Sequence, residues 1–316
     1  MKALYSIAKQ LNWQPEQFID CPKGYVRVQV AAAGLNRADL LQRQGKYPPP
    51  KGITEALGLE CAGIITETNQ VTNWQVGDRV CALLAGGAMA SEVVIDARHL
   101  LPVPKNLSLI EAAVIPEVYA TAWLNLFQIA QLKSTEKVLI HAGAGGVGSA
   151  AIQLCKAFNN PCWVTVGSQA RLDYCLSLGA QGGVVRTENL DALTKDAPFD
   201  VILDPVGADY MALNTDLLNV DGRWVIIAMM GGHKAEINLA KLLAKRIQLT
   251  GSTLRSRDND FKATLIKGLT DKVWPLFETN QLSHNLAKSF AIEEAEQAFE
   301  ALASNQINGK IALVIN

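Results

Sequence analysis

A glycine-rich turn between an apolar strand and a helix is the feature that most limits how this chain can fold. The stretch KVLIHAGAGGVGSAAIQL leads from a strand pattern into a helical one and places Gly143, Gly145 and Gly148 in the spacing G-x-G-x-x-G. Glycines at this spacing permit a sharp turn, a close approach of the backbone to a ligand, and tight packing of the helix on the strand. The spacing alone is common, so its surroundings decide what it indicates.

The surroundings of the turn are an alternation of strand and helix patterns over residues 117–257. The strand patterns are apolar throughout: KVLIHA, CWVTVG, GGVV, FDVILDPVG, GRWVIIAM and RIQLTGS. Such strands are typical of a parallel sheet covered by helices on both faces. A helix N-terminus after a glycine turn offers N–H groups and a positive dipole to phosphates. We therefore predict a dinucleotide-binding α/β domain; the alternative is a glycine turn that has lost its ligand.

The end of the second strand indicates which dinucleotide binds. About 20 residues after a glycine turn, an acidic residue usually accepts hydrogen bonds from the adenosine ribose. Here the strand ends in Gly167 and Ser168, and Arg171 follows in the next helix. A hydroxyl and a guanidinium fork suit a 2′-phosphate, and Arg186 after the next strand adds a second positive charge. The predicted cofactor is NADP(H), although Arg171 could instead be a solvated helix residue.

The two ends of the chain lack the regular alternation of strand and helix patterns. Val26, Val28 and Val30 alternate with polar residues, which predicts a half-buried strand, and further short strands follow among turns. Near the C-terminus, the segment 292–304 has an apolar helical face and a last strand follows it. We predict a β-rich domain made of residues 1–116 and 258–316, interrupted by the nucleotide-binding domain 117–257.

Composition and charge exclude several classes of function. The formal net charge is −1, with 49% hydrophobic and 19% charged residues. This balance gives no basis for binding nucleic acid or an anionic membrane. No apolar run reaches the roughly 18 residues that a membrane span needs, so we expect a cytoplasmic protein. The six cysteines form no C-x-x-C pair, and most of them are expected to be buried, unreactive thiols.

The sequence resembles a known family, the zinc-independent quinone oxidoreductases of the medium-chain dehydrogenase/reductase superfamily. The resemblance covers essentially the whole chain and rests on these stretches: LNRADLLQRQGKYPPP, LGLECAGII, VGDRV, IPEVYATAW, HAGAGGVGSAAIQL, GSQARL, LDPVG, GRWVIIAMMGG, GSTLRSRD and NGKIAL. NRADLLQRQGKY and LRSRD point to the branch of the tumour-suppressor-induced quinone oxidoreductase. The resemblance implies a GroES-like domain from both termini, a central Rossmann domain, and an active site in the cleft between them.

The residues at the family's metal positions argue against zinc. Zinc-dependent relatives use an early Cys, the His of a G-H-E motif, and a later Cys. Here the first position holds Asn36 and the histidine position holds Leu59. Leucine cannot bind zinc, and an amide is a poor substitute for a thiolate. Without a Lewis acid, alcohol dehydrogenation is disfavoured, and electron-poor quinones and activated alkenes remain as hydride acceptors.

The resemblance also implies site residues. Asn36 and Asp39 would lie near the nicotinamide and the substrate, Tyr47 would line the cleft, and Thr121 would hydrogen-bond near the cofactor. The remaining implied cofactor contacts come from loops that follow strands: Gly146, Val147, Met229, Met230, Gly231, Ser252 and Thr253. Catalysis would consist of holding the nicotinamide against the acceptor in a water-poor cleft, with the proton coming from solvent or Tyr47.

Several of these residues have plainer interpretations. Asn36 and Asp39 could cap the short helix that they begin, Tyr47 could be a packed loop aromatic, and Thr121 could bond its own helix. His141, at the end of a strand, is expected to be structural. Arg255 and Arg257 are expected to be structural or interface residues rather than catalytic ones.

Three functions remain open from the sequence. The first is an NADPH-dependent reductase of quinones, and the second is an NADPH-dependent reductase of enal or enone double bonds, which would use the same hydride donor. The third is a non-enzymatic NADPH-binding protein. The resemblance and an apolar last strand of the Rossmann sheet, RIQLTGS, also predict a homodimer.

Overall fold

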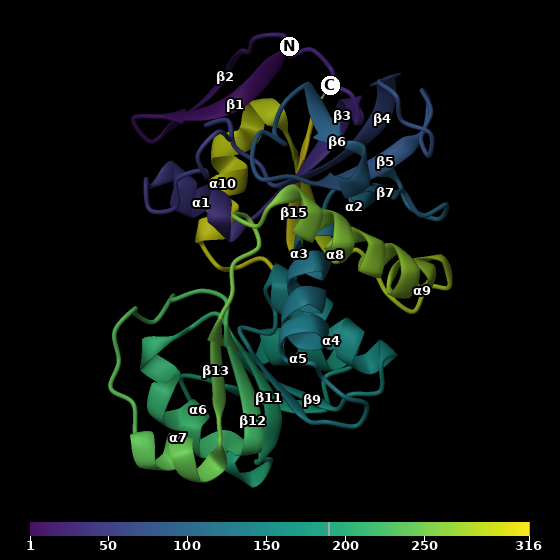
Figure 1. Ribbon diagram of the computed structural model, residues 1–316. Coiled ribbons are helices and arrows are strands. Elements are labelled where there is room, and N and C mark those ends of the chain that lie inside the picture. The colour runs from purple at the N-terminus through teal and green to yellow at the C-terminus, as the bar shows by residue number, and fades with distance from the viewer. Residues whose placement is uncertain (189, 316) are drawn as a thin grey trace. The chain divides into compact units, whose positions relative to one another are not determined.

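The chain forms two compact units in the computed structural model, which describes residues 1–188 and 190–315. Unit 1 comprises Met1–Ala120 and Leu254–Asn316, and unit 2 comprises Thr121–Thr253. Both chain termini therefore belong to unit 1 (Figure 1). The sequence-based junctions were 116/117 and 257/258. Asn189 and Asn316, which fall within the predicted ranges, lie outside the described residues.

Unit 1 is built on a seven-stranded sheet in the order β14-β15-β3-β4-β5-β7, with β6 paired to β3. Its strands are β3 (Tyr25–Leu35), β4 (Glu60–Thr68), β5 (Arg79–Leu83), β6 (Glu92–Asp96), β7 (Leu100–Pro102), β14 (Leu286–Ala291) and β15 (Lys310–Val314). β15 pairs antiparallel with β3, so the last strand of the chain joins the first strand of this sheet. Alternate valines of β3 enter the core of the unit, as its period-two pattern predicts.

The helices of unit 1 surround this sheet. They are α1 (Arg37–Arg43), α2 (Leu109–Ala112), α3 (Pro116–Trp123, which crosses the junction), α8 (Asn259–Lys272), α9 (Trp274–Glu278) and α10 (Ala295–Ala303), with short 3₁₀ turns at Ala97–His99 and Ile292–Glu294. In α10, Ala295, Ala298 and Phe299 are buried, which agrees with the predicted apolar face.

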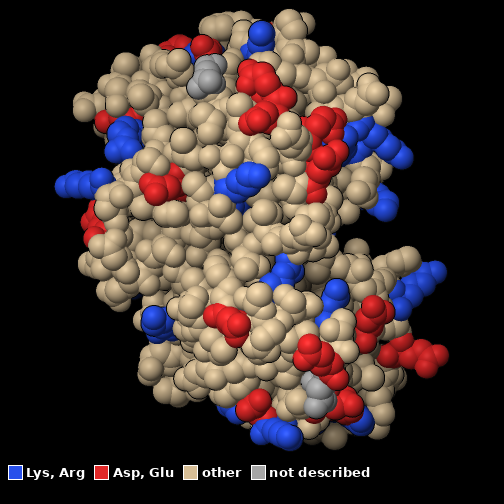
Figure 2. Space-filling model, turned by 180° about the vertical axis from the view of Figure 1, so that it is seen from behind, with Lys and Arg blue, Asp and Glu red and all other residues tan. Residues whose placement is uncertain are grey.

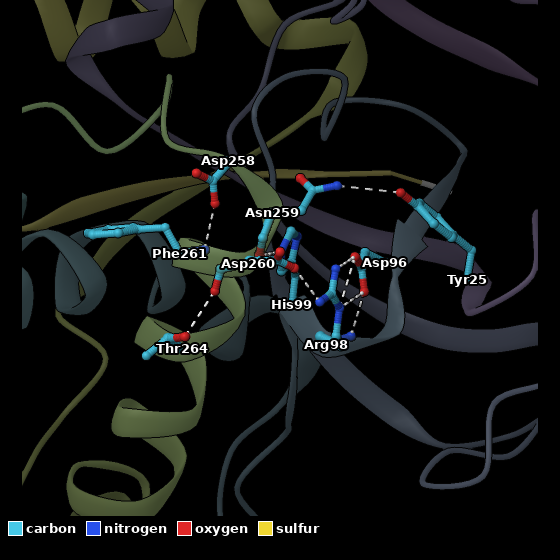
Figure 3. Close-up of polar contacts among 9 residues, drawn as sticks. All are labelled: Tyr25, Asp96, Arg98, His99, Asp258, Asn259, Asp260, Phe261 and Thr264. Atoms are coloured by element: carbon cyan, nitrogen blue, oxygen red, sulfur yellow. Dashed lines mark hydrogen bonds and ion pairs between the residues drawn. The ribbon is translucent and has the colours of Figure 1, made fainter.

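Figure 3 shows the polar contacts between the beginning of α8 and the 3₁₀ turn Ala97–His99, which follows β6. Nε2 of His99 lies 2.9 Å from the carbonyl oxygen of Asn259, and Nη1 of Arg98 lies 2.6 Å from the carboxylate of Asp260. Arg98 also pairs with Asp96, the last residue of β6. These contacts join segments far apart in the sequence, since His99 and Asn259 are separated by 160 positions.

Unit 2 contains the predicted parallel sheet, whose strand order is β10-β9-β8-β11-β12-β13 with every neighbouring pair parallel. The strands are β8 (Val138–His141), β9 (Cys162–Val166), β10 (Gly182–Val185), β11 (Phe199–Asp204), β12 (Leu218–Ile226) and β13 (Gln248–Gly251). In chain order this is 3-2-1-4-5-6, the Rossmann order, which has its switch point between the first and fourth strands, β8 and β11.

Helices cover both faces of this sheet, with α4 and α5 on one side and α6 and α7 on the other (Figure 1). Their bounds are α4 (Gly146–Ala157), α5 (Gln169–Leu178), α6 (Met211–Leu217) and α7 (Leu239–Lys245), with 3₁₀ turns at Leu190–Lys195 and Ala208–Tyr210. The central strands are buried on both faces, which explains their apolar sequences. The α/β fold class, with a Rossmann sheet and a GroES-like β-rich domain, is therefore confirmed.

Some elements differ from the sequence-based interpretation. An N-terminal hairpin of β1 (Lys2–Ile7) and β2 (Gln10–Pro15), the short strand β7 and the strand β14 were not predicted. The hairpin turn uses Ala8 at φ 48° and Lys9 at φ 67°. It therefore lacks the Asn-Gly or Asp-Gly pair that marks such turns. The predicted helix after Ile115 is α only to Trp123 and continues as a π-helix over Leu124–Ile129.

Two further sequence-based expectations concern cysteines and membranes. All six cysteines are buried and free. In the part of the chain that is described, no helix has both the length and the apolar character needed to cross a bilayer.

Candidate functional site

The glycine-rich turn lies at the carboxyl end of β8, next to the switch point of the sheet. A Cβ at Gly143 would lie 2.7 Å from Val164, and one at Gly148 would lie 2.5 Å from the carbonyl oxygen of Gly143, so these two glycines permit close packing within unit 2. At Gly145, in contrast, the nearest atom would be 3.4 Å away, at ordinary contact distance. Gly145 caps α4, whose first turn has N–H groups without partners inside the helix. Packing within unit 2 therefore does not require a glycine at position 145, in contrast to positions 143 and 148.

The ends of β9 and β10 carry the residues predicted to hold a 2′-phosphate. Gly167 and Ser168 are exposed, and a Cβ at Gly167 would meet nothing within 4 Å. Ser168 caps α5, but its hydroxyl does not bond the helix backbone. The nearby acidic residue Asp173 lies further along α5 and accepts a hydrogen bond from Gln169.

Two arginines lie close to one another at this edge. Burial lowers the pKa of Arg171, and the charge of Arg186 lowers it further, so the guanidinium groups repel each other. Arg171 is half-buried and Arg186 is exposed. An anion held between them would relieve this repulsion.

The loops after β11 and β12 are joined to each other. Met230 and Gly231 donate backbone hydrogen bonds to Pro205 and Val206 at 3.1 and 2.8 Å. Met229 and Met230 are large apolar side chains, and they are 62% and 49% exposed. Ser252 follows β13, and its N–H bonds the carbonyl oxygen of Ile226 at the end of β12. The cofactor residues predicted on unit 2 beyond Thr121 therefore share the carboxyl edge of one sheet.

A buried network of polar side chains lies next to this edge of the sheet and is centred on Asp204 and His141. Asp204 accepts hydrogen bonds from Asn214 and Trp224 with one oxygen, and from the backbone of Val206 and Gly207 with the other. The remaining amide oxygen of Asn214 lies 2.8 Å from Nε2 of His141. That nitrogen must therefore carry the proton. Nδ1 of His141 then accepts from the Thr165 hydroxyl at 3.0 Å. Burial lowers the pKa of His141, in keeping with the predicted structural role.

Asn36, at the beginning of α1 in unit 1, is held by a buried ion pair. Lys310 Nζ lies 2.7 Å from Glu60 Oε1 and 2.5 Å from Asn36 Oδ1, and Asn36 Nδ2 donates to Glu60 Oε1 at 2.9 Å. The Lys310 and Glu60 side chains are 3% and 0% exposed. Both ends of the Asn36 amide are thereby occupied, and its orientation is set.

Asp39 lies one turn further along α1 and is buried. Its carboxylate accepts hydrogen bonds from the backbone N–H of Asn36 at 2.8 Å and of Gly58 at 3.1 Å. Burial raises the pKa of Asp39 to about 6, although both hydrogen bonds and the charge of Lys310 oppose this shift. The first bond is the helix cap that the sequence left open as an alternative role, so capping by Asp39 is present whether or not it also acts on a substrate.

Tyr47 and Thr121 complete the predicted set. Tyr47 is half-buried in the segment after α1, and burial together with the charge of Glu117 raises the pKa of its phenol. Thr121 is half-buried on α3, and its carbonyl oxygen accepts a hydrogen bond from Asn125 at 2.7 Å.

Two other features of the described residues bear on where a site could lie. No group of three or more His, Cys, Asp and Glu residues among them could hold a metal ion. A pocket of about 460 Å³ opens in unit 1 between Lys23–Tyr25, Gln70–Trp74 and Asp96–Arg98. It contains none of the predicted site residues, and its Arg98 is engaged by Asp96 and Asp260 (Figure 3).

The sequence motifs indicated candidate residues in the loops but not the residues that support them. Glu60 and Lys310 stand in the GLE and NGK stretches that carried the resemblance, yet nothing local pairs them with Asn36. Asp204 stands in the LDPVG stretch that carried the resemblance, but its partners Asn214 and Trp224 could not be assigned, because a buried polar network is recognisable only once the strands are assembled.

Two protein families match the sequence, each by its own stretch. The alcohol dehydrogenase GroES-like domain matches residues 22–105, and the zinc-binding dehydrogenase family matches residues 146–270. The chain belongs to the medium-chain dehydrogenase/reductase superfamily. Membership in the tumour-suppressor-induced branch remains a prediction from the sequence motifs.

Members of this superfamily with known structures include both kinds of reductase considered above. The CurK enoyl reductase is 29% identical with a TM-score of 0.86, covering 100% of this chain and 99% of that one. The Escherichia coli quinone oxidoreductase, solved in complex with NADPH, is 26% identical with a TM-score of 0.85, covering 99% of both chains.

Curated relatives place similar sequences inside larger proteins. The phenolphthiocerol synthesis polyketide synthase type I Pks15/1 of Mycobacterium bovis is 32% identical over 310 residues, which are 95% of this chain and 14% of that protein. Across the first curated relatives, the chain spans between 5% and 64% of their length.

Proposed function

We propose that the protein is an oxidoreductase that transfers hydride from NADPH to quinones without zinc. The observation that carries this proposal is the composition of one sheet edge in unit 2. There, Gly145 caps the N-terminus of α4, Ser168 and Arg186 follow the ends of β9 and β10, and Arg171 lies in the first turn of α5. The NADPH complex of the related Escherichia coli quinone oxidoreductase supports the same cofactor.

The residues of this edge fit the cofactor in separate ways. The first-turn N–H groups of α4, at Gly146 and Val147, would bind the pyrophosphate, for which the absence of a side chain at Gly145 leaves room. Ser168 and the two arginines would bind the 2′-phosphate. Met229 to Gly231, with Ser252 and Thr253, would line the path toward the nicotinamide. The bound cofactor would supply the hydride.

Residues of unit 1 would act on the acceptor. The amide of Asn36 is oriented by Lys310 and Glu60. Its second Nδ2 hydrogen, which has only a long contact of 3.5 Å to the carbonyl oxygen of Gly34, would be the donor offered to the acceptor or the nicotinamide. Tyr47 would donate a proton to the reduced acceptor, because a phenol carries its proton at neutral pH. Asp39 would hold the beginning of α1, and with it Asn36, in place.

The proposal that zinc takes no part rests on residues, although one matching family is named for zinc binding. Leu59 is an apolar side chain with 2% exposure at the histidine position. At the first cysteine position, Asn36 already has its amide oxygen bonded to the Lys310 ammonium. A second cation beside that ammonium would be repelled.

Reduction of enal or enone double bonds is the second candidate function. It is favoured by the similarity to the CurK enoyl reductase and to polyketide synthases. The same hydride donor and the same fixed Asn36 amide would serve it, because an enone also develops negative charge on oxygen.

A non-enzymatic NADPH-binding protein is the third candidate function. Figure 2 shows acidic and basic side chains interspersed on the face drawn, with no continuous basic stripe among its described residues, which gives no support to RNA binding.

Oxidation of NADPH against a panel of ortho-quinones, para-quinones and enals tests this proposal. We expect turnover highest with quinones and unchanged after dialysis against a chelator. Preference for enals would favour the second function, and cofactor binding without any turnover would favour the third. Loss of one zinc per chain together with activity would overturn the metal-free reaction.

A further inference from the structure

Arg255 is a buried cation whose hydrogen bonds all go to neutral oxygen atoms. The residue is 5% exposed, and no carboxylate among the described residues lies within ion-pair distance of it. Buried charges are normally paired, and an unpaired one is costly. Burial accordingly lowers the pKa of Arg255. The contacts that Arg255 makes with other segments of unit 1 offer an explanation for an unpaired buried charge at this position.

The guanidinium of Arg255 joins three separate segments of unit 1. Nε donates to the carbonyl oxygen of Ala85 at 2.6 Å, Nη2 donates to the side-chain oxygen of Gln42 at 2.7 Å, and Nη1 donates to the carbonyl oxygen of Tyr47 at 3.2 Å. Gln42 in turn donates to the carbonyl oxygen of Glu55 at 2.9 Å. Arg255 therefore contacts residues 44–58, which follow α1, directly at Tyr47 and through Gln42 at Glu55.

Two further contacts make this arrangement specific. The Arg255 guanidinium lies over the ring of Tyr47, with its carbon 5.2 Å from the ring centroid. The ammonium of buried Lys262 donates to the carbonyl oxygen of Arg255 at 2.9 Å and fixes its backbone. Gly86 allows the segment to approach closely, since a Cβ there would lie 2.8 Å from Ile53.

We propose that Arg255 is a positioning residue, which holds the segment 44–58 and the Tyr47 phenol in the arrangement that meets the acceptor. This proposal rests on the proposed function, in which Tyr47 donates the proton. Arg255 acts through Tyr47 and does not itself contact the acceptor. A guanidinium suits three acceptors spread around one plane, because its five donors lie in one rigid fork, whereas the three donors of an ammonium radiate from a single nitrogen.

The test compares Arg255→Gln, Arg255→Lys, Tyr47→Phe and the double variant Arg255→Gln/Tyr47→Phe. A misplaced reacting group can cost about 100-fold in rate, so we expect Arg255→Gln to lower kcat/KM for a quinone on the order of 10- to 100-fold. The dissociation constant of NADPH should change by less than about twofold, because the proposed phosphate contacts all lie on unit 2 and no proposed cofactor contact lies in the segment 44–58. The double variant should lose little more than Arg255→Gln alone, and Arg255→Lys should not restore activity.

Arg257→Gln is the matched control. Arg257 stands two positions further along, is exposed, and lies over the ring of Phe261 at 4.6 Å. Its replacement should leave kcat/KM near the wild-type value. Equal losses in Arg255→Gln and Arg257→Gln, additive effects of Arg255→Gln and Tyr47→Phe, or full recovery in Arg255→Lys would each overturn the proposal.

Hydrogen exchange provides a reading that does not depend on turnover. Amides of residues 44–58 should exchange faster in Arg255→Gln and unchanged in Arg257→Gln, while unchanged exchange in both would overturn the proposal. If the wild type reduces no acceptor, the proposed function fails, but exchange still decides whether Arg255 holds this segment. Should Arg255→Gln not fold, Gln42→Leu removes one of the three contacts and is expected to cause a smaller change of the same kind; no change would count against Arg255.

Discussion

Lys310 and Glu60 form an ion pair of 2.7 Å in the interior of unit 1, where their side chains are 3% and 0% exposed. Glu60 also accepts the backbone N–H of Glu117 at 2.9 Å, and Lys310 donates to the carbonyl oxygen of Leu35 at 2.9 Å. The pair therefore links β15, β4 and the beginning of α3 around Asn36. A buried pair contributes little net stability, because desolvation offsets the attraction, but it can select one arrangement of its neighbours.

The first prediction concerns the loss of either charge of this pair. Lys310→Met leaves a buried carboxylate unpaired and should lower the free energy of unfolding by about 3–5 kcal/mol. Lys310→Met/Glu60→Gln removes both charges, and it should be more stable than Lys310→Met by about 1 kcal/mol or more. Denaturant unfolding of the four proteins of this cycle measures the coupling. Equal stability of the single and double variants would show that the two charges do not depend on each other.

The second prediction is a pH dependence caused by Asp39. Burial raises its pKa to about 6 from a usual value near 3.8, so the folded state binds a proton more tightly than the unfolded state. The corresponding stabilisation is complete below about pH 4 and is lost as the pH rises through about 6. Relative to Asp39→Asn, the wild type should lose on the order of 2–3 kcal/mol across this window. Urea unfolding at pH 4, 5, 6 and 7 measures the difference; a difference independent of pH would contradict the assignment.

The parts of the fold that sequence could predict are those set by local pattern. The glycine turn, the apolar strands of unit 2 and the helix at Arg37–Arg43 follow from spacing and periodicity over a few residues. The β1–β2 hairpin could not be predicted, because Ala8 and Lys9 adopt positive φ without a glycine. The support of Asn36 could not be predicted either, since Lys310 lies 274 positions away. Arg255 was expected to be structural, and its three acceptors come from segments at least 170 positions earlier.

The third prediction concerns assembly, for which we propose a homodimer. Every residue of β13 is exposed, α7 has no buried residue, and Leu239 and Leu243 are 67% and 80% exposed. An open parallel edge beside exposed leucines is a surface that a second copy would cover. Light scattering at micromolar concentration should give twice the chain mass, and Leu243→Glu should shift it toward one. Val76→Glu, which changes another exposed apolar residue, should not. A wild-type protein with the mass of one chain would contradict the proposal.

The most direct test of the central claim is the titration of NADPH and NADH against the wild type, Arg171→Ala, Arg186→Ala and Ser168→Asp. Hydrogen bonds to a charged group contribute about 1.5–3 kcal/mol each, so two partly exposed ones suggest roughly 30-fold tighter binding of NADPH. Arg171→Ala should weaken NADPH and leave NADH nearly unchanged, Arg186→Ala should do so less, and Ser168→Asp should repel the phosphate and favour NADH. Arg246→Ala, at an arginine paired with Asp221 elsewhere on unit 2, should change neither affinity. Equal wild-type affinities for the two cofactors, or equal losses of both in Arg171→Ala, would contradict the account.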